Sequence, residues 1–215
     1  MKTAALIGNR TALNLGIAAD LKDMGYNVFS AWADEDAPDG RRVDPLKADS
    51  LIAAANAVGA PVDLLIVSLH RTFDDPKATI LDKLDLEALK KAYEYNTLGA
   101  IRAINVFLPL LEQGEGKRIA VITNRESSNS ATREACGFGD HMAHAPLNMA
   151  MSELFNGLRP KGYTFRMYVR DARDDYDPFA AEYITRGRSV DLGSPKHTDE
   201  NRFVLRDSMN IEIPW

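Results

Sequence analysis

The sequence predicts an α/β fold in which a doubly wound parallel sheet is flanked by helices within a single domain, residues 1–215. Short apolar runs alternate along the chain with segments whose apolar residues recur every three or four positions. The run at residues 62–69 is almost entirely apolar, as a parallel strand buried on both faces is. No shift in composition marks a domain boundary, so one continuous alternation of strands and helices is expected.

The first 32 residues contain the unit from which such sheets are built. Residues 3–7 form an apolar run that ends at Gly8, and residues 15–24 have helical spacing up to Gly25. A second apolar run covers residues 26–32. Parallel strands need a crossover connection, usually a helix. This stretch therefore predicts a strand–helix–strand unit.

The rest of the chain repeats this pattern. Residues 84–111 form a long helical region, one helix or two, punctuated by Asn96 and Gly99. The C-terminal residues 203–205 and 211–215 are expected to close the sheet. The other expected elements are helices at 45–58, 137–158 and 178–186, and strands at 62–69, 119–123 and 163–169.

Composition narrows the classes of function. The net charge of −5 argues against a general nucleic-acid surface or an anionic membrane surface. The single cysteine, Cys136, excludes an internal disulfide and a cysteine-based zinc site. The sequence has no signal-peptide pattern and no apolar run long enough to span a bilayer. We expect a cytoplasmic protein that binds a small molecule.

Three of the four histidines are expected at one edge of the sheet. His70 follows the run 62–69, while Asp140, His141 and His144 lie where a polar loop gives way to a helix. Ligands of such sheets bind beyond the carboxyl ends of the strands. Asp140 and His144 are four residues apart and share a helical face, so the carboxylate can orient the imidazole as a general acid or base. Alternatively, Asp140 is a helix N-cap and His144 a solvated residue of the first turn.

Several short segments between roughly residues 2 and 169 are similar to the motifs of a known family. They are Asn96-Thr97-Leu98-Gly99-Ala100 followed by residues 107–111, the strand 119–123, and Ala145-Pro146-Leu147-Asn148-Met149. In this order they resemble the short-chain dehydrogenase/reductase family. The resemblance implies a Rossmann-like fold, NAD or NADP as cofactor, and a small carbonyl or hydroxyl compound as substrate. It also implies a homodimer or homotetramer formed by the helices at 84–111 and 140–158, and a substrate lid at 170–200.

The resemblance assigns cofactor-binding positions. Gly8 keeps the first glycine of the family's glycine-rich turn, while Ala12 and Asn14 replace the other two. We expect Asn14 to be tolerated because asparagine adopts positive φ. Trp32 stands at the end of the second strand, where an acidic residue would select a free ribose hydroxyl, and Asp34 follows. Trp32 either stacks on an adenine or is a half-buried aromatic at the rim.

The choice between NAD and NADP stays open at this point. Arg10, Arg41 and Arg42 are candidates for holding a 2′-phosphate, and a solvated charged loop is the alternative. His70 stands where the family has the glycine of its Asn-Asn-Ala-Gly turn. A large polar ring is thereby expected where the cofactor normally passes.

The catalytic positions depart most from the family. Asn96 matches the asparagine that holds a water in the family's proton relay. The serine position falls within residues 123–128, on Thr123 or Asn124 by strand register and on Ser127 by spacing to the helix. Asp140 stands at the tyrosine position and His144 at the lysine position.

The register of that helix has an alternative. Pro146 is favoured at the first position of a helix and would mark a later start. A slip of one residue would then place His141, instead of Asp140, at the tyrosine position.

Three functions remain open from the sequence. The first is an oxidoreductase of the family's type, in which Asp140 and His144 form a rebuilt proton relay. The second is a non-redox isomerase, dehydratase or lyase that uses these groups, with His70 or His141, for acid–base chemistry. The third is a catalytically silent binding module. A metal site made of the same four residues matches no specific zinc spacing.

Overall fold

The computed structural model describes residues 1–34, 37, 41–170, 175–186, 199 and 202–215. Most of the expected substrate lid at 170–200 therefore lies outside the described residues, as does part of the acidic loop 34–42. The predicted single α/β domain is confirmed, and its elements alternate as expected. None of the helices in the described part of the chain is long and apolar enough to cross a membrane.

The sheet has seven strands in the order β2-β1-β3-β4-β5-β6-β7. The first six run parallel, and β7 pairs antiparallel with β6 at one edge. Residues 203–215 thus close the sheet, as predicted. The strands are β1 (Thr3–Gly8), β2 (Asn27–Trp32), β3 (Leu64–Ser68), β4 (Arg118–Asn124), β5 (Thr164–Arg170), β6 (Leu205–Arg206) and β7 (Glu212–Ile213).

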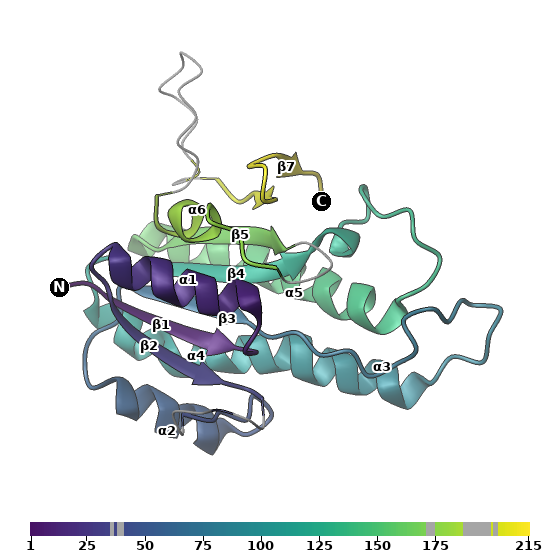
Figure 1. Ribbon diagram of the computed structural model, residues 1–215, viewed down its shortest axis with the longest axis horizontal. Helices are drawn as coiled ribbons and strands as arrows, with labels where there is room; N and C mark the ends of the chain where they lie inside the picture. Colours follow the sequence, from purple (N-terminus) through teal and green to yellow (C-terminus); the bar gives the residue numbers. More distant parts are fainter. Residues whose placement is uncertain (35–36, 38–40, 171–174, 187–198, 200–201) are drawn as a thin grey trace, which may run out of the picture.

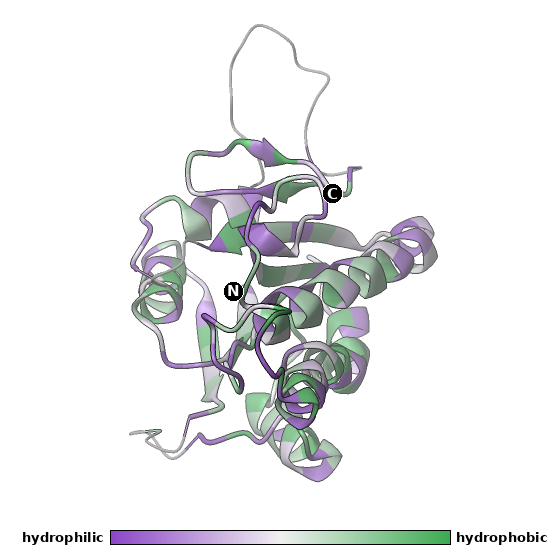
Figure 2. Ribbon diagram, turned by 90° about the vertical axis from the view of Figure 1, so that its right-hand side faces the viewer, coloured by the Kyte–Doolittle hydropathy of each residue, from purple (hydrophilic) through white to green (hydrophobic). Residues whose placement is uncertain are grey.

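Helices cover both faces of this sheet (Figure 1). One face carries α1 (Ala12–Asp23) and α6 (Ala180–Arg186), and the other carries α2 (Ala48–Val58), α4 (Gly99–Gln113) and α5 (Phe138–Leu158). Each layer encloses its own apolar core, one centred on Leu6 and Ile66 and the other on Ile7 and Val121. Figure 2 looks along the sheet from the side where the parallel strands end. The shorter elements are α3 (Leu86–Ala92), η1 (Tyr93–Leu98), η2 (Arg125–Ser127) and η3 (Arg159–Lys161).

The long helical region is a single rod with a wide turn in its middle. It begins as α3, widens into the π-helical turn η1 and continues as α4. Asn96 lies in this wide turn and is fully buried. Its amide bonds the main chain of Arg71, accepting from N at 2.9 Å and donating to O at 3.0 Å. The region is therefore continuous from residue 86 to residue 113. The irregularity that Asn96 and Gly99 indicate in the sequence is a π-helical turn and not a break between two helices.

Helix α5 begins earlier than Pro146 suggests. Gly137, at φ 71°, is its N-cap, and Pro146 lies inside the helix. The expected helix at 137–158 is therefore confirmed. The alternative of a later start at Pro146 is wrong, and so is the N-cap role for Asp140, which occupies the first turn. A proline inside a helix leaves a carbonyl group without its donor. The helix is braced nearby because the Thr97 hydroxyl donates to the carbonyl oxygen of Ala143.

The helices at 84–111 and 140–158, which are expected to form the dimer or tetramer, turn several of their apolar side chains into the core of the chain itself. Met151 and Phe155 are buried in the core of the chain itself. Ile101 packs against the same core and is partly buried. On α5 the exposed large apolar side chains are instead Met142 and Met149.

The turn after β1 has two local causes. A Cβ at Gly8 would lie 2.5 Å from the main-chain oxygen of Ser68 on the neighbouring strand. Gly8 is therefore required by the close approach of β1 and β3. Asn14 is helical, and positive φ among the described non-glycine residues occurs only at Lys117 and Asn210. The expected reason for tolerating Asn14 is wrong: its amide instead donates to the carbonyl oxygen of Asn9 at 2.8 Å.

Gly8→Ala should lower the free energy of unfolding by about 1–3 kcal/mol, the usual cost of forcing extra volume into a packed site. Gly157→Ala is the matched control, because a Cβ there meets nothing within 4 Å on an exposed stretch of α5. This control should raise stability by about 0.5–1 kcal/mol. Urea unfolding of both variants measures the difference, and equal effects would contradict the packing explanation for Gly8.

Candidate active site

The carboxylate of Asp140 lies at the centre of a polar cluster at the carboxyl edge of the sheet. Its Oδ1 atom is 3.1 Å from Nε2 of His70 and 3.0 Å from Nδ1 of His144. His70 follows β3 and its partners come from α5, so two elements that meet only at this edge supply the three groups. The sequence predicted this contact in two ways. His70 and α5 were expected at the carboxyl edge of the sheet, which we call the edge rule, and the four-residue spacing placed Asp140 and His144 on one helical face.

The two imidazoles have different environments. The His144 side chain is 1% exposed, whereas that of His70 is 24% exposed. Nδ1 of His144 also lies 2.9 Å from the carbonyl oxygen of Asp140, which fixes the ring against its own helix. Nε2 of His144 is buried and has no hydrogen-bond partner among the described residues. The expectation of a solvated His144 is therefore wrong, since the first turn of α5 faces the sheet edge.

The other oxygen of Asp140 has polar neighbours as well. Oδ2 accepts a hydrogen bond from Nδ2 of Asn124 at 2.9 Å and lies 3.5 Å from an Nη atom of Arg170. Asn124 ends β4 and Arg170 ends β5, so side chains from the ends of three strands and from α5 surround one carboxylate. Arg170 is 7% exposed and places a buried positive charge beside it.

These neighbours determine the charge of Asp140. Burial by itself would raise the pKa of the carboxyl group, but the close approach of His144 and His70 lowers it by more. The pKa of Asp140 therefore lies well below its ordinary value, and the group is ionised at neutral pH. An ionised carboxylate holds a proton on each imidazole nitrogen that faces it, which assigns the tautomer from geometry.

Ser127 belongs to a neighbouring network. Its hydroxyl donates to the carbonyl oxygen of Asn124 at 2.6 Å and accepts from the amide of Asn148 at 2.8 Å. Thr123 donates to the same Asn148 side chain at 3.0 Å. Of the residues considered for the serine position, Asn124 is therefore the one in contact with Asp140. Ser127 packs behind it and holds the loop after β4.

A cavity of about 350 Å³ opens beside the Asp140 cluster. His70, Asn124, Asp140 and Arg170 line its inner side, and His141 lines it without a described contact to Asp140. His141 packs instead against its own N-cap, where a Cβ on Gly137 would meet the imidazole at 2.9 Å. No group of three or more metal-ligating side chains among the described residues is arranged to hold an ion.

The turn after β1, where the phosphates of a nucleotide are expected to bind, has the carboxylate of Asp34 beside it. The carboxylate of Asp34 accepts hydrogen bonds from the main-chain N–H of Arg10 and, at 3.0 Å, from the amide of Asn9. Trp32 is only 4% exposed and packs under α1, so it is neither a half-buried rim aromatic nor a free stacking platform. Arg10 and Arg41 line a separate groove of about 470 Å³ beside Trp32.

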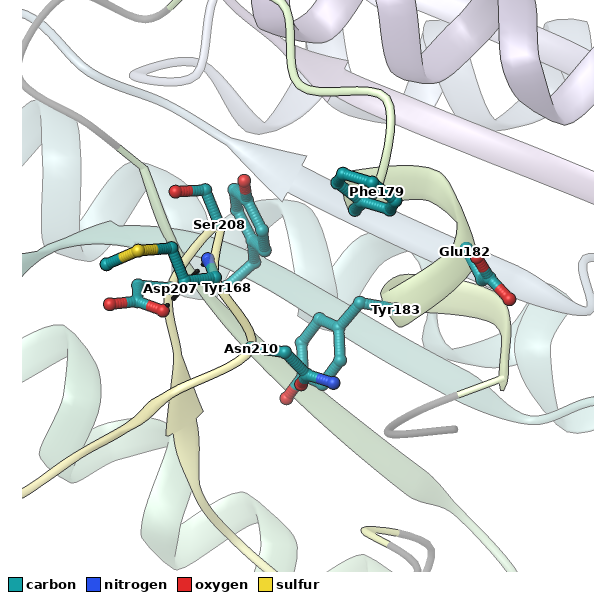
Figure 3. A pocket seen from close by; sticks show the side chains of 8 residues that line it. Tyr168, Phe179, Glu182, Tyr183, Asp207, Ser208 and Asn210 are labelled. Carbon is teal, nitrogen blue, oxygen red and sulfur yellow. Dashed lines mark hydrogen bonds between the residues drawn. The ribbon is translucent and has the colours of Figure 1, made fainter. Parts of the chain in front are cut away.

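Tyr176 packs against α1. A Cβ at Gly16 would overlap the ring of Tyr176, whose hydroxyl bonds the carboxylate of Asp20 at 3.2 Å. A cavity of about 360 Å³ lies between α6 and the β6–β7 hairpin. Figure 3 shows Tyr168, Tyr183 and Asn210 around it. This second cavity shares no lining residue with the one at Asp140.

Two residues of the site were missed in the sequence. Asn9 directly follows Gly8 in the first turn, and Arg170 directly follows the expected strand 163–169. The edge rule that singled out His70 applies to Arg170 equally. That rule applies to Asn9 as well, at the end of β1, but its partners Asp34 and His70 are remote in sequence and become adjacent only once three parallel strands are in register.

Comparison with known proteins supports this architecture. No family model matches the chain. The chain is 29% identical over 169 residues to the C-signal of Myxococcus xanthus, covering 75% of this chain and 98% of that protein. It is 25% identical over 196 residues to the 1-hydroxy-2-glutathionyl-2-methyl-3-butene dehydrogenase of Rhodococcus sp. strain AD45, covering 86% of this chain and 85% of that enzyme.

A solved structure extends the comparison. A Burkholderia multivorans protein, provisionally assigned as a short-chain dehydrogenase/reductase and crystallised with NADP, matches with a TM-score of 0.73 at 17% identity. The match covers 100% of this chain and 99% of that one. The fold is thus that of the short-chain dehydrogenases/reductases.

In the variant Asp140→Asn the free energy of unfolding should depend less on pH in the acidic range than it does in the wild type. Because the pKa of Asp140 is lowered by folding, its stabilisation is complete above the unfolded value of about 3.9 and is lost as the pH falls below it. The wild type should therefore lose stability more steeply below about pH 5 than the variant does. At neutral pH the variant should be less stable by about 1–3 kcal/mol.

Urea unfolding at a series of pH values measures both effects. Glu153→Gln is the control, since it removes an exposed carboxylate from the same helix without touching the cluster. Parallel pH curves for wild type and Asp140→Asn would show that this carboxylate is not held ionised by the fold.

Proposed function

We propose that this chain is an NAD-dependent oxidoreductase that interconverts a small carbonyl compound and its alcohol, with the proton transferred by a His70–Asp140–His144 cluster. The observation that carries the proposal is the ionised Asp140 carboxylate held between two imidazoles beside a cavity at the carboxyl edge of the sheet. A general acid–base group at that edge is what carbonyl reduction requires besides a hydride.

The cluster divides the proton chemistry among its members. Asp140 stays ionised, so it orients the two imidazoles and does not itself donate a proton. His70 lines the cavity and is the more exposed imidazole, so it gives the proton to the carbonyl oxygen in reduction and takes it back in oxidation. His144 lies behind the carboxylate and fixes it from the buried side.

The residues at the first turn fit a dinucleotide. The first N–H groups of α1 have no acceptor within the helix, and such an N-terminus favours a phosphate. Asp34 stands beside this turn as an acceptor for ribose hydroxyls, and its charge repels a 2′-phosphate. The buried Nε2 of His144, which has no hydrogen-bond partner in the described part of the chain, provides a further acceptor at the lysine position. A bound nicotinamide would supply or accept the hydride.

The relatives support the class of reaction. The Rhodococcus relative is a dehydrogenase, and the Burkholderia structure contains NADP. Asp34 argues for the unphosphorylated cofactor in this chain, so the preference is proposed to differ from that neighbour.

Cofactor-independent proton transfer is the second candidate. It is favoured by His70, which places a polar ring at the position where the family has a glycine and the cofactor passes. The same three groups would then remove a proton next to a carbonyl group, as an isomerase or lyase does. Nicotinamide binding separates the two candidates.

Titration with NADH and NADPH, followed by tryptophan quenching and cofactor fluorescence, should show saturable binding of NADH. NADH should bind at least about tenfold more tightly than NADPH, about 1.4 kcal/mol, because Asp34 faces the ribose. Tighter binding of NADPH would contradict the role of Asp34. No binding at millimolar cofactor would contradict the oxidoreductase and leave proton transfer as the function.

Activity at 340 nm over a panel of small aldehydes and ketones tests the proton donor. For any compound reduced, His70→Gln should lower kcat about 10²- to 10⁴-fold, the usual contribution of a general acid, with little change in NADH affinity. His141→Gln should retain most of the rate, because His141 lines the same cavity without contacting Asp140. Equal losses in both variants would remove His70 from its proposed role.

A further inference from the structure

We infer that Asn9 is a positioning residue that holds His70 against Asp140, and that it links the nucleotide turn to the proton-transfer group. The inference rests on the proposed role of His70. It begins from the position of Asn9, which directly follows Gly8 at the end of β1 and is 8% exposed. An asparagine here buries an amide that has to be satisfied by its surroundings.

The Asn9 side chain makes three hydrogen bonds to three different elements. Its Oδ1 accepts from the main-chain N–H of His70 at 2.8 Å. Its Nδ2 donates to Oδ1 of Asp34 at 3.0 Å and to the hydroxyl oxygen of Tyr95 at 3.3 Å. The two ends of one rigid amide therefore join the carboxylate at the nucleotide turn to the main chain of the imidazole.

A second amide completes the clamp. Asn96 bonds both main-chain groups of Arg71, the residue after His70, at 2.9 and 3.0 Å. The segment that carries His70 is thus fixed on one side by Asn9 and on the other by the wide turn of the long helix. With both main-chain positions fixed, the imidazole reaches Asp140 at 3.1 Å.

The chemistry of the amide explains why asparagine suits this position. Only a side chain with both a donor and an acceptor satisfies the Asp34 carboxylate and the His70 N–H together. Aspartate would oppose Asp34 with a like charge, and alanine would leave both partners open. A ribose hydroxyl that takes the place of the Asn9 amide at Asp34 would thereby disturb Asn9, which also holds the main chain of His70.

The test is a spectroscopic comparison of the ligand-free protein, which does not depend on cofactor binding. The side-chain N–H signal of His70 facing Asp140 should be observed by NMR in the wild type, because its exchange with water is slowed by the contact. In Asn9→Ala this signal should be lost to exchange, while the corresponding His144 signal remains. An unchanged His70 signal would overturn the inference.

Asn9→Ser serves as the second variant if alanine prevents folding, because its hydroxyl keeps a polar group in the turn but does not reach His70. The same loss of the His70 signal is expected. For any substrate found, kcat should fall about 10- to 100-fold, as for a displaced catalytic group, while NADH affinity changes less. A merely structural role would lower stability and leave the signals of His70 and His144 equally affected.

The outcomes separate this inference from the proposed function. Failure of NADH to bind while Asn9→Ala still releases His70 would remove the oxidoreductase and keep Asn9 as the positioning residue. Binding of NADH with His70 undisturbed in both variants would keep the oxidoreductase and remove Asn9 from the role.

Discussion

The negative charge of Asp140 has to be compensated within the fold, and residues from much of the structure contribute to this. A carboxylate buried near the end of a sheet costs several kcal/mol unless charged and hydrogen-bonding partners surround it. Here the partners come from the ends of β3, β4 and β5 and from α5 itself. These partners come together only when the parallel strands are in register. The ionised state of Asp140 therefore depends on the topology of the sheet.

The supporting residues follow from the same requirement. Two imidazoles can both face one carboxylate only if each main chain is fixed, and the clamp by Asn9 and Asn96 provides this for His70. For His144 the fixing element is its own helix, through the Asp140 carbonyl oxygen. The chain thus uses two buried amides, Asn9 and Asn96, to fix the main chain at His70 and Arg71.

Much of the fold could be predicted from the sequence, because apolar periodicity and turn residues are local signals. The strand–helix alternation, the buried β3 and the closing C-terminal strands were all expected. Errors arose where a local signal was overridden by packing. Pro146 suggested a helix start, yet Gly137 caps the helix nine residues earlier. Asn14 suggested positive φ, yet its amide closes the turn from within α1.

The site could be predicted in part. Spacing gave the Asp140–His144 pair, and the edge rule added His70. The charge state of Asp140 could not be predicted, since it depends on how far the carboxyl group is buried and on how closely His144 and His70 approach it in the folded chain. The link through Asn9 was equally hidden, because its partners are 25 and 61 residues away.

The most direct measurement is a ¹³C NMR titration of the side-chain carboxyl carbon of Asp140. The account predicts no inflection near the ordinary aspartate value of about 3.9, because the two imidazoles keep the group ionised well below it. An inflection at or above that value would mean that Asp140 accepts a proton in the working range. It would then be a proton donor in its own right, and the division of roles between Asp140 and His70 would be contradicted.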